Sequence, residues 1–164
     1  MKTAIRCSEL RFAYPAPANE KAFSLHIPAW ELKKGEQCVV YGPSGGGKST
    51  FLNLVAGILA MQEGSLQVLD LDLSQSTEQS RTEHRIQNIG FVFQDYPLLN
   101  YLNAQENILL PYRLNPVLQL SKEVVQRAQE LLKRLGLKNK GHRKPSQLSQ
   151  GERQRVSIAR ALIT

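Results

Sequence analysis

The chain has 164 residues, of which 41% are hydrophobic and 21% are charged. This length allows one domain with its own core, and the composition is that of a globular protein, not a disordered one. No apolar run approaches the ~20 residues needed to cross a bilayer, and the first residues lack the apolar segment of a signal peptide.

The net charge is +7, which would suit nucleic acid or an acidic membrane surface as a partner. Part of this excess lies between residues 133 and 144. No aromatic residue for stacking on bases lies within that stretch, so we favour a solvated face there. Cys7 and Cys38 are expected to be free thiols in a reducing cytoplasm.

The N-terminal part, up to about residue 37, is expected to form short strands. Ile5 to Phe12 and Phe23 to Ile27 show partial alternation of apolar and polar residues, and a turn-forming stretch at 14–19 separates them. A second turn, Lys33–Glu36, leads into the apolar run Cys38–Tyr41. That run is typical of a buried parallel strand.

The stretch after this run carries the most specific pattern in the chain. It consists of Gly42, Pro43, Ser44, Gly45, Gly46, Gly47, Lys48, Ser49 and Thr50, and it matches the phosphate-binding pattern G-x-x-x-x-G-K-[ST]. Glycines let backbone N–H groups approach phosphate oxygens, because no Cβ stands in the way. Lys48 can reach the β- and γ-phosphates, and the Ser49 hydroxyl can bind Mg²⁺.

Apolar residues from Phe51 to Leu59 recur at helical spacing, so the loop should open into a helix. The N-terminus of that helix would attract the anion further. The pattern and its flanking elements therefore predict a nucleotide-phosphate site.

The middle of the chain is expected to contain two further pieces of sheet. Leu66 to Leu73 is typical of a strand pair or an edge, and the polar residues 74–83 indicate a surface turn or a short helix. Ile89–Phe93 is a second candidate for a buried strand, and it ends at Gln94.

The remainder of the chain is predicted to be helical. Ala104–Leu110 forms one helix that Pro111 should stop. Ser121 is a good N-cap for a helix that Gly136 closes, and Ser149 caps a last helix.

A second anion site is indicated at Ser149, Gln150, Gly151 and Glu152. Ser149 and Glu152 form an S-x-x-E capping box, which by itself explains both residues. However, a hydroxyl, a glycine and a helix N-terminus are also what a second phosphate contact would use. Both interpretations stay open on these residues alone.

The loop Gly42–Thr50, Gln94 and the segment Leu148–Arg155, in this order and spacing, resemble three motifs of ABC-transporter ATPase subunits. These motifs are the Walker A motif, the Q-loop and the signature, and the resemblance covers the whole chain. Gln150 stands where the signature usually has glycine, and Glu152 where it often has glutamine.

A further resemblance points to one branch of this family. The stretch Phe91–Leu99, followed by Glu106–Pro111, is similar to the lipoprotein-releasing and macrolide-exporting branch.

The resemblance implies ATP and Mg²⁺ as cofactors and assigns roles to the site residues. Tyr14 is expected to stack on adenine; the alternative is a partly buried tyrosine at a strand end. Lys48 and Gln94 are the expected catalytic residues, with Gln94 positioning the attacking water, and Ser49 and Gln94 are the expected ligands of Mg²⁺. In a head-to-tail dimer, Ser149–Glu152 would contact the ATP that the Walker A loop of the other subunit holds.

The implied fold is an α/β P-loop NTPase of the ABC ATPase type with an N-terminal antiparallel β region. We expect a β region with the P-loop core at 1–94, a helical subdomain at 95–147, and the signature motif with its helix at 148–164. The next element of the family, a strand ending in Asp-Glu, and a later histidine do not occur in the sequence. We therefore expect a chain truncated before Walker B, with the C-terminal part of the sheet missing, and no hydrolysis by this chain alone.

The implied function is ATP hydrolysis that drives a membrane transporter, with export or the extraction of lipid or lipoprotein favoured. Transmembrane permease subunits are the implied partners, the inner face of the cell membrane is the implied location, and no nucleic acid is expected. One alternative is a truncated, non-catalytic nucleotide-binding fragment. Another is a soluble ABC-type ATPase acting on nucleic acid or ribosomes, but the coiled-coil insertions or tandem cassettes that would support it are not visible.

Overall fold

The structure is a computed structural model that describes residues 2–15 and 22–164. It divides into two compact units, Met1–His84 and Arg85–Thr164. The predicted turn at 14–19 lies largely outside the described residues, and the division of the chain at residues 94 and 147 stays a prediction.

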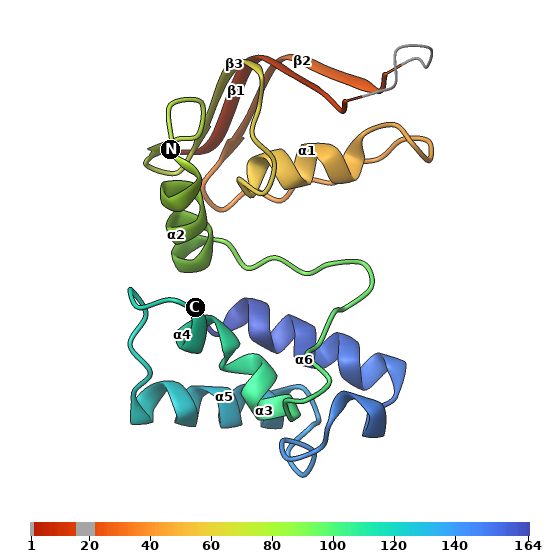
Figure 1. The fold of residues 1–164 in the computed structure, drawn as a ribbon, viewed down its shortest axis with the longest axis vertical. Helices are drawn as coiled ribbons and strands as arrows, with labels where there is room; N and C mark the ends of the chain where they lie inside the picture. The colour runs from red at the N-terminus through yellow and green to blue at the C-terminus, as the bar shows by residue number, and fades with distance from the viewer. Residues whose placement is uncertain (1, 16–21) are drawn as a thin grey trace. The chain divides into compact units, whose positions relative to one another are not determined.

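The first unit contains a four-stranded antiparallel sheet with the strand order β2-β1-β3-β4 (Figure 1). The strands are β1 (Thr3–Ala13), β2 (Ser24–Lys33), β3 (Glu63–Val68) and β4 (Leu71–Asp72). Apolar side chains of β1 and β3, among them Leu10, Phe12 and Leu66, are buried. The predicted strands at 5–12 and 23–27 and the predicted strand pair at 66–73 are confirmed.

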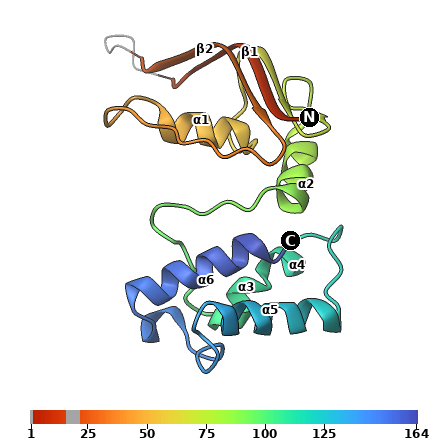
Figure 2. The same cartoon turned by 180° about the vertical axis from the view of Figure 1, so that it is seen from behind.

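Helix α1 (Lys48–Val55) lies along one face of this sheet, as both views show (Figures 1 and 2). The ring of Phe51 in α1 meets that of Trp30 in β2 edge to face, with 5.3 Å between the ring centroids, and Leu54 is fully buried. The predicted helix is therefore confirmed, but it ends before Leu59. Gly57 has a positive φ of 65°, which the α-helical backbone cannot contain.

Two predicted strands are wrong: the segments Cys38–Tyr41 and Ile89–Phe93 do not form strands. Val39 and Tyr41 are 82% and 91% exposed, and Cys38, expected to be buried, is exposed as well. A strand requires a neighbour that pairs with its backbone N–H and C=O groups. Within the described residues all strand pairing is antiparallel and none of it involves either segment.

The second unit is helical. Helix α2 (Glu78–Asn88) spans the boundary between the units and overlaps the stretch 74–83, where a surface turn or a short helix was expected. After it come α3 (Ala104–Ile108), α4 (Leu110–Leu114), α5 (Lys122–Arg134), a 3₁₀ turn at Pro145–Gln147 and α6 (Gln150–Leu162). Figure 2 shows α6 running beside α3 and α5. Apolar residues from these elements form one core: Ala104, Ile108, Leu109, Ala128, Leu132, Leu137, Leu148, Val156, Ala159 and Ile163.

The predicted helix boundaries are confirmed where they rest on caps. The Ser121 hydroxyl accepts a hydrogen bond from Val124 N, and Gly136 closes α5 with a φ of 71°. The prediction that Pro111 ends the helix that begins at Ala104 is wrong. Pro111 lies in the first turn of α4, where its missing N–H would have had no intrahelical partner anyway.

Candidate nucleotide site

The glycine-rich loop leads directly into α1. Gly47 is the N-cap of the helix, with a φ of 84° and no side-chain cap, and Lys48 is its first residue. The backbone N–H groups at the start of α1 therefore point out of the helix end with no capping side chain in front of them. Such an end attracts anions through these donors and through the helix dipole.

Gly47 is required here for two reasons. Its positive φ disfavours any residue with a side chain, and a Cβ at this position would lie 2.8 Å from Phe23 Cζ and 3.1 Å from Leu25 Cδ1. The loop thus packs against the β2 side of the sheet at the residue that begins the helix.

Lys48 turns its side chain back into the loop. Its ammonium donates hydrogen bonds to the carbonyl oxygens of Gly42 at 3.0 Å and Pro43 at 2.7 Å. The Gly46 N–H also donates to Pro43 O, at 3.2 Å. A positive charge is thereby held at the loop on two carbonyl acceptors, which phosphate oxygens can replace as its partners.

Tyr14 contacts the helix that follows the loop. Its hydroxyl lies 3.4 Å from Thr50 Oγ1, within hydrogen-bond distance, and its ring meets Phe12 edge to face at 4.8 Å. The residue is nevertheless 41% exposed. Tyr14 is therefore held near the loop while it stays partly exposed, and its stacking on adenine stays a prediction.

Ser49, the expected oxygen ligand of Mg²⁺, is exposed in the first turn of α1, whereas the next residue, Thr50, is buried. An accessible hydroxyl beside the phosphate loop fits a hard cation, which prefers oxygen ligands. Among the described residues there is no cluster of three or more His, Cys, Asp or Glu side chains that could hold a metal.

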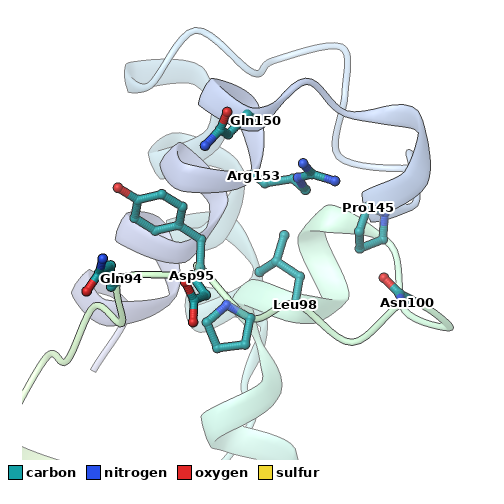
Figure 3. Close-up of a pocket in the computed structure, with 9 residues that line it drawn as sticks. Gln94, Asp95, Leu98, Asn100, Pro145, Gln150 and Arg153 are labelled. Atoms are coloured by element: carbon teal, nitrogen blue, oxygen red, sulfur yellow. The ribbon is translucent and has the colours of Figure 1, made fainter.

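Gln94 and the signature segment belong to the second unit. Gln94, Gln150 and Arg153 line one cavity of about 410 Å³, together with the loop 95–100 (Figure 3). Figure 3 shows Gln150 and Arg153 on α6 and Gln94 on the connecting segment. Because Gln94 and the phosphate loop lie in different units, the predicted contact of Gln94 with Mg²⁺ stays a prediction.

The signature segment forms the predicted capping box at the N-terminus of α6. Ser149 Oγ accepts a hydrogen bond from Glu152 N at 3.3 Å, and Glu152 Oε2 accepts one from Ser149 N at 2.9 Å. Ser149 and Gln150 are exposed. These two residues are therefore accessible to a ligand, whereas Gly151 is half-buried. The contact of this segment with a second subunit's ATP stays a prediction.

Glu152 itself faces its own chain. It is 8% exposed, and its second oxygen, Oε1, accepts a hydrogen bond from Lys140 Nζ. This hydrogen bond, followed by that from the Ser149 backbone, lowers the pKa of the Glu152 carboxyl below its ordinary value. Lys140 was not predicted as a site residue, because no local pattern links it to a residue twelve positions further on.

The glycine loop with its lysine at a helix N-terminus defines a phosphate-binding P-loop protein. The family model described as "ABC transporter" matches residues 25–164. The chain therefore belongs to the ABC transporter family, as an ATP-binding domain.

Similar proteins narrow this assignment. The chain is 45% identical over 135 residues to the lipoprotein-releasing system ATP-binding protein LolD of Hydrogenovibrio crunogenus, covering 82% of this chain and 58% of that protein. It is 35% identical over 164 residues to LolD of Colwellia psychrerythraea, covering 100% of this chain and 62% of that protein. The chain thus spans about three fifths of the length of these relatives.

The fold has a close counterpart among solved structures. The dimeric structure of the ATP-binding cassette MJ0796, in a post-hydrolysis state bound to ADP and Pi, matches with a TM-score of 0.86 and 34% identity. The match covers 97% of this chain and 69% of that chain. The expected ABC ATPase fold and the resemblance to the lipoprotein-releasing branch are thereby confirmed. Among the described residues, no helix combines the length and apolar character needed to cross a bilayer.

Proposed function

We propose that this chain binds ATP with Mg²⁺ and serves as the ATP-binding part of an ABC transporter that extracts lipoprotein or lipid from a membrane. The observation that carries the proposal is the geometry of Lys48, whose ammonium lies against the carbonyls of Gly42 and Pro43 at the N-terminus of α1. The similarity to LolD proteins supports the substrate class.

Phosphate binding follows from the chemistry of the loop. The N–H groups at the start of α1 supply hydrogen-bond donors and a partial positive charge. Lys48 adds a full charge that can exchange its carbonyl partners for the β- and γ-phosphate oxygens, which bind an ammonium more strongly because they are charged. The hydroxyl of Ser49 is a suitable oxygen ligand for Mg²⁺, which would neutralise charge on the phosphates when bound.

Tyr14 would hold the base. Tyr14 is partly exposed, and its hydroxyl contact with Thr50 links it to the helix that begins at the phosphate loop. Base–aromatic stacking tolerates different bases, so this contact would contribute affinity more than selectivity among nucleotides.

The signature segment would complete the site of a second subunit. We infer a head-to-tail dimer in which Ser149, Gln150 and Gly151 at the N-terminus of α6 meet the γ-phosphate held by the partner's loop, with Gln94 orienting the attacking water. The MJ0796 cassette, of similar fold, forms a dimer with ADP and Pi bound. Permease subunits at the inner face of the cell membrane would be the mechanical partners.

Equilibrium binding of a fluorescent ATP analogue to the purified chain, with and without Mg²⁺, tests this function. Saturable binding that ATP displaces, and that Mg²⁺ strengthens, is expected. Binding that ATP does not displace would refute the proposal.

A further inference from the structure

Gln62, which no sequence motif includes, closes the end of β1 beside Tyr14. Its side-chain Oε1 accepts a hydrogen bond from Ala13 N at 2.9 Å, and its Nε2 donates to Ala13 O at 3.0 Å. One side-chain amide thus satisfies both backbone groups of a single residue. Ala13 is the last residue of β1, and Tyr14 follows it directly.

This contact continues the sheet beyond the point where its strands stop pairing. The ladder between β1 and β3 ends at the pair Arg11 and Glu63, and Gln62 N adds one more backbone hydrogen bond, to Arg11 O at 3.0 Å. The side-chain amide, which offers a carbonyl and an N–H like a peptide group, then takes the place of the missing β3 residue opposite Ala13.

The backbone around Tyr14 is therefore held from both sides. On the β2 side, Ala13 pairs with Ser24 and Tyr14 N donates to Phe23 O at 3.2 Å. On the β3 side, Gln62 is the residue that contacts Ala13. Strand ends open locally at little cost when few hydrogen bonds hold them, so removing Gln62 would loosen the backbone that carries the tyrosine ring.

We infer that Gln62 is a positioning residue for the base of the nucleotide: it holds Ala13 so that the ring of Tyr14 stays in place for stacking. The inference rests on the proposed function, in which Tyr14 stacks on adenine. Gln62 directly precedes β3 and bonds to β1, whereas the phosphate contacts come from the loop and α1, so its effect should concern the base and not the phosphates.

The test compares two ligands that share the phosphates and differ in the base. Binding of ATP and of inorganic tripolyphosphate is measured for the purified wild-type chain and for Gln62→Ala. We expect Gln62→Ala to weaken ATP binding about three- to tenfold, the scale of losing one or two exposed hydrogen bonds, and to change tripolyphosphate binding less than about twofold. Gln62→Glu, which keeps the acceptor for Ala13 N but places a second acceptor against Ala13 O, should show the same base-dependent loss.

Gln67→Ala is the matched control. Gln67 is also an exposed glutamine, in β3 of the same sheet, and its Nε2 donates to Leu69 O at 3.4 Å, away from β1's last residue. This variant should bind both ligands like the wild type.

A double mutant tests whether Gln62 affects ATP binding through Tyr14. Tyr14→Ala should weaken ATP binding by roughly 5- to 100-fold, as expected for the loss of one stacking contact, while Tyr14→Phe should largely keep it. If Gln62 acts through Tyr14, then Tyr14→Ala combined with Gln62→Ala should bind ATP as Tyr14→Ala alone does.

The other possible outcomes contradict either the role of Gln62 or the adenine contact of Tyr14. If Gln62→Ala weakens both ligands equally, leaves both unchanged, or adds its full effect to that of Tyr14→Ala, then Gln62 does not position the base. If Tyr14→Ala shows no loss that is specific to ATP, the adenine contact in the proposed function is wrong and the inference falls with it. If only Tyr14→Ala shows that loss, the proposed function stands and the role of Gln62 is refuted.

Discussion

Lys140 and Glu152 form a partly buried ion pair that fixes the start of α6, the helix of the signature segment. The ammonium of Lys140 donates to Glu152 Oε1, while Glu152 Oε2 accepts the Ser149 N–H at 2.9 Å. One carboxylate thus links the segment before α6 to the residue that caps it. Through these two contacts Glu152 holds the exposed Ser149 at the N-terminus of α6.

This pair predicts a pH-dependent contribution to stability. The pKa of Glu152 is lowered in the folded protein, chiefly by the hydrogen bond from Lys140. The carboxylate therefore stabilises the fold above the pKa that it has in the unfolded chain, and this contribution is lost as the pH falls through the lower, folded pKa. Glu152→Gln, which can still accept from Ser149 N, should lower the urea midpoint at pH 7, and the difference from wild type should shrink on acidification.

Glu130→Gln serves as the control for the loss of one negative charge, because Glu130 is exposed on α5. Its urea midpoint should stay close to that of the wild type at every pH. A gap between wild type and Glu152→Gln that is constant with pH would contradict the proposed contribution of the ion pair.

A second prediction separates backbone strain from steric clash in the phosphate loop. Gly47 and Gly35 have nearly the same positive φ, 84° and 86°, but only at Gly47 would a Cβ meet a neighbour, Phe23 Cζ at 2.8 Å. Gly35→Ala should cost about 1–2 kcal/mol of unfolding free energy through strain alone. Gly47→Ala should cost about 1–3 kcal/mol more, because Phe23 must move. Thermal unfolding of the two variants measures this difference, and equal costs would show that the loop does not pack on Phe23 as described.

The motifs and caps of this protein could be predicted from the sequence because they are local. Gly47 at a helix start and Ser121 and Ser149 as N-caps each depend on neighbours within a few residues, and the strands β1 and β2 are indicated by simple alternation. The strands expected at Cys38–Tyr41 and Ile89–Phe93 have the right apolar character but no pairing partner within the described residues. Local composition cannot reveal whether a partner is present.

The supporting contacts of the site could not be predicted for a related reason. The pairs Gln62–Ala13 and Tyr14–Thr50 join residues 49 and 36 positions apart. No spacing rule connects a glutamine before one strand to the last backbone group of another. Such contacts follow from the register of the sheet and from the packing of α1, which only the folded structure supplies.

A third prediction concerns catalysis by the 164-residue chain. It should bind ATP without turnover above background, because the described residues contain no group of three or more His, Cys, Asp or Glu side chains that could hold Mg²⁺ and polarise the attacking water. Loss of such groups commonly slows phosphoryl transfer by orders of magnitude. A phosphate-release assay, with Lys48→Ala to reveal any contaminating ATPase, measures this. Multiple turnovers that depend on Lys48 would show that other residues of this chain complete the site.

Lys48 is the residue on which binding of the triphosphate depends most directly. Titration calorimetry with Mg²⁺ and ATP should detect binding by the wild type and by Lys34→Ala, which removes the same charge from the exposed turn after β2. Lys48→Ala should abolish measurable binding, because hydrogen bonds to charged groups of this kind are worth about 1.5–3 kcal/mol each. Equal affinity of Lys48→Ala and the wild type, with both chains folded, would contradict the assignment of this loop as the ATP site.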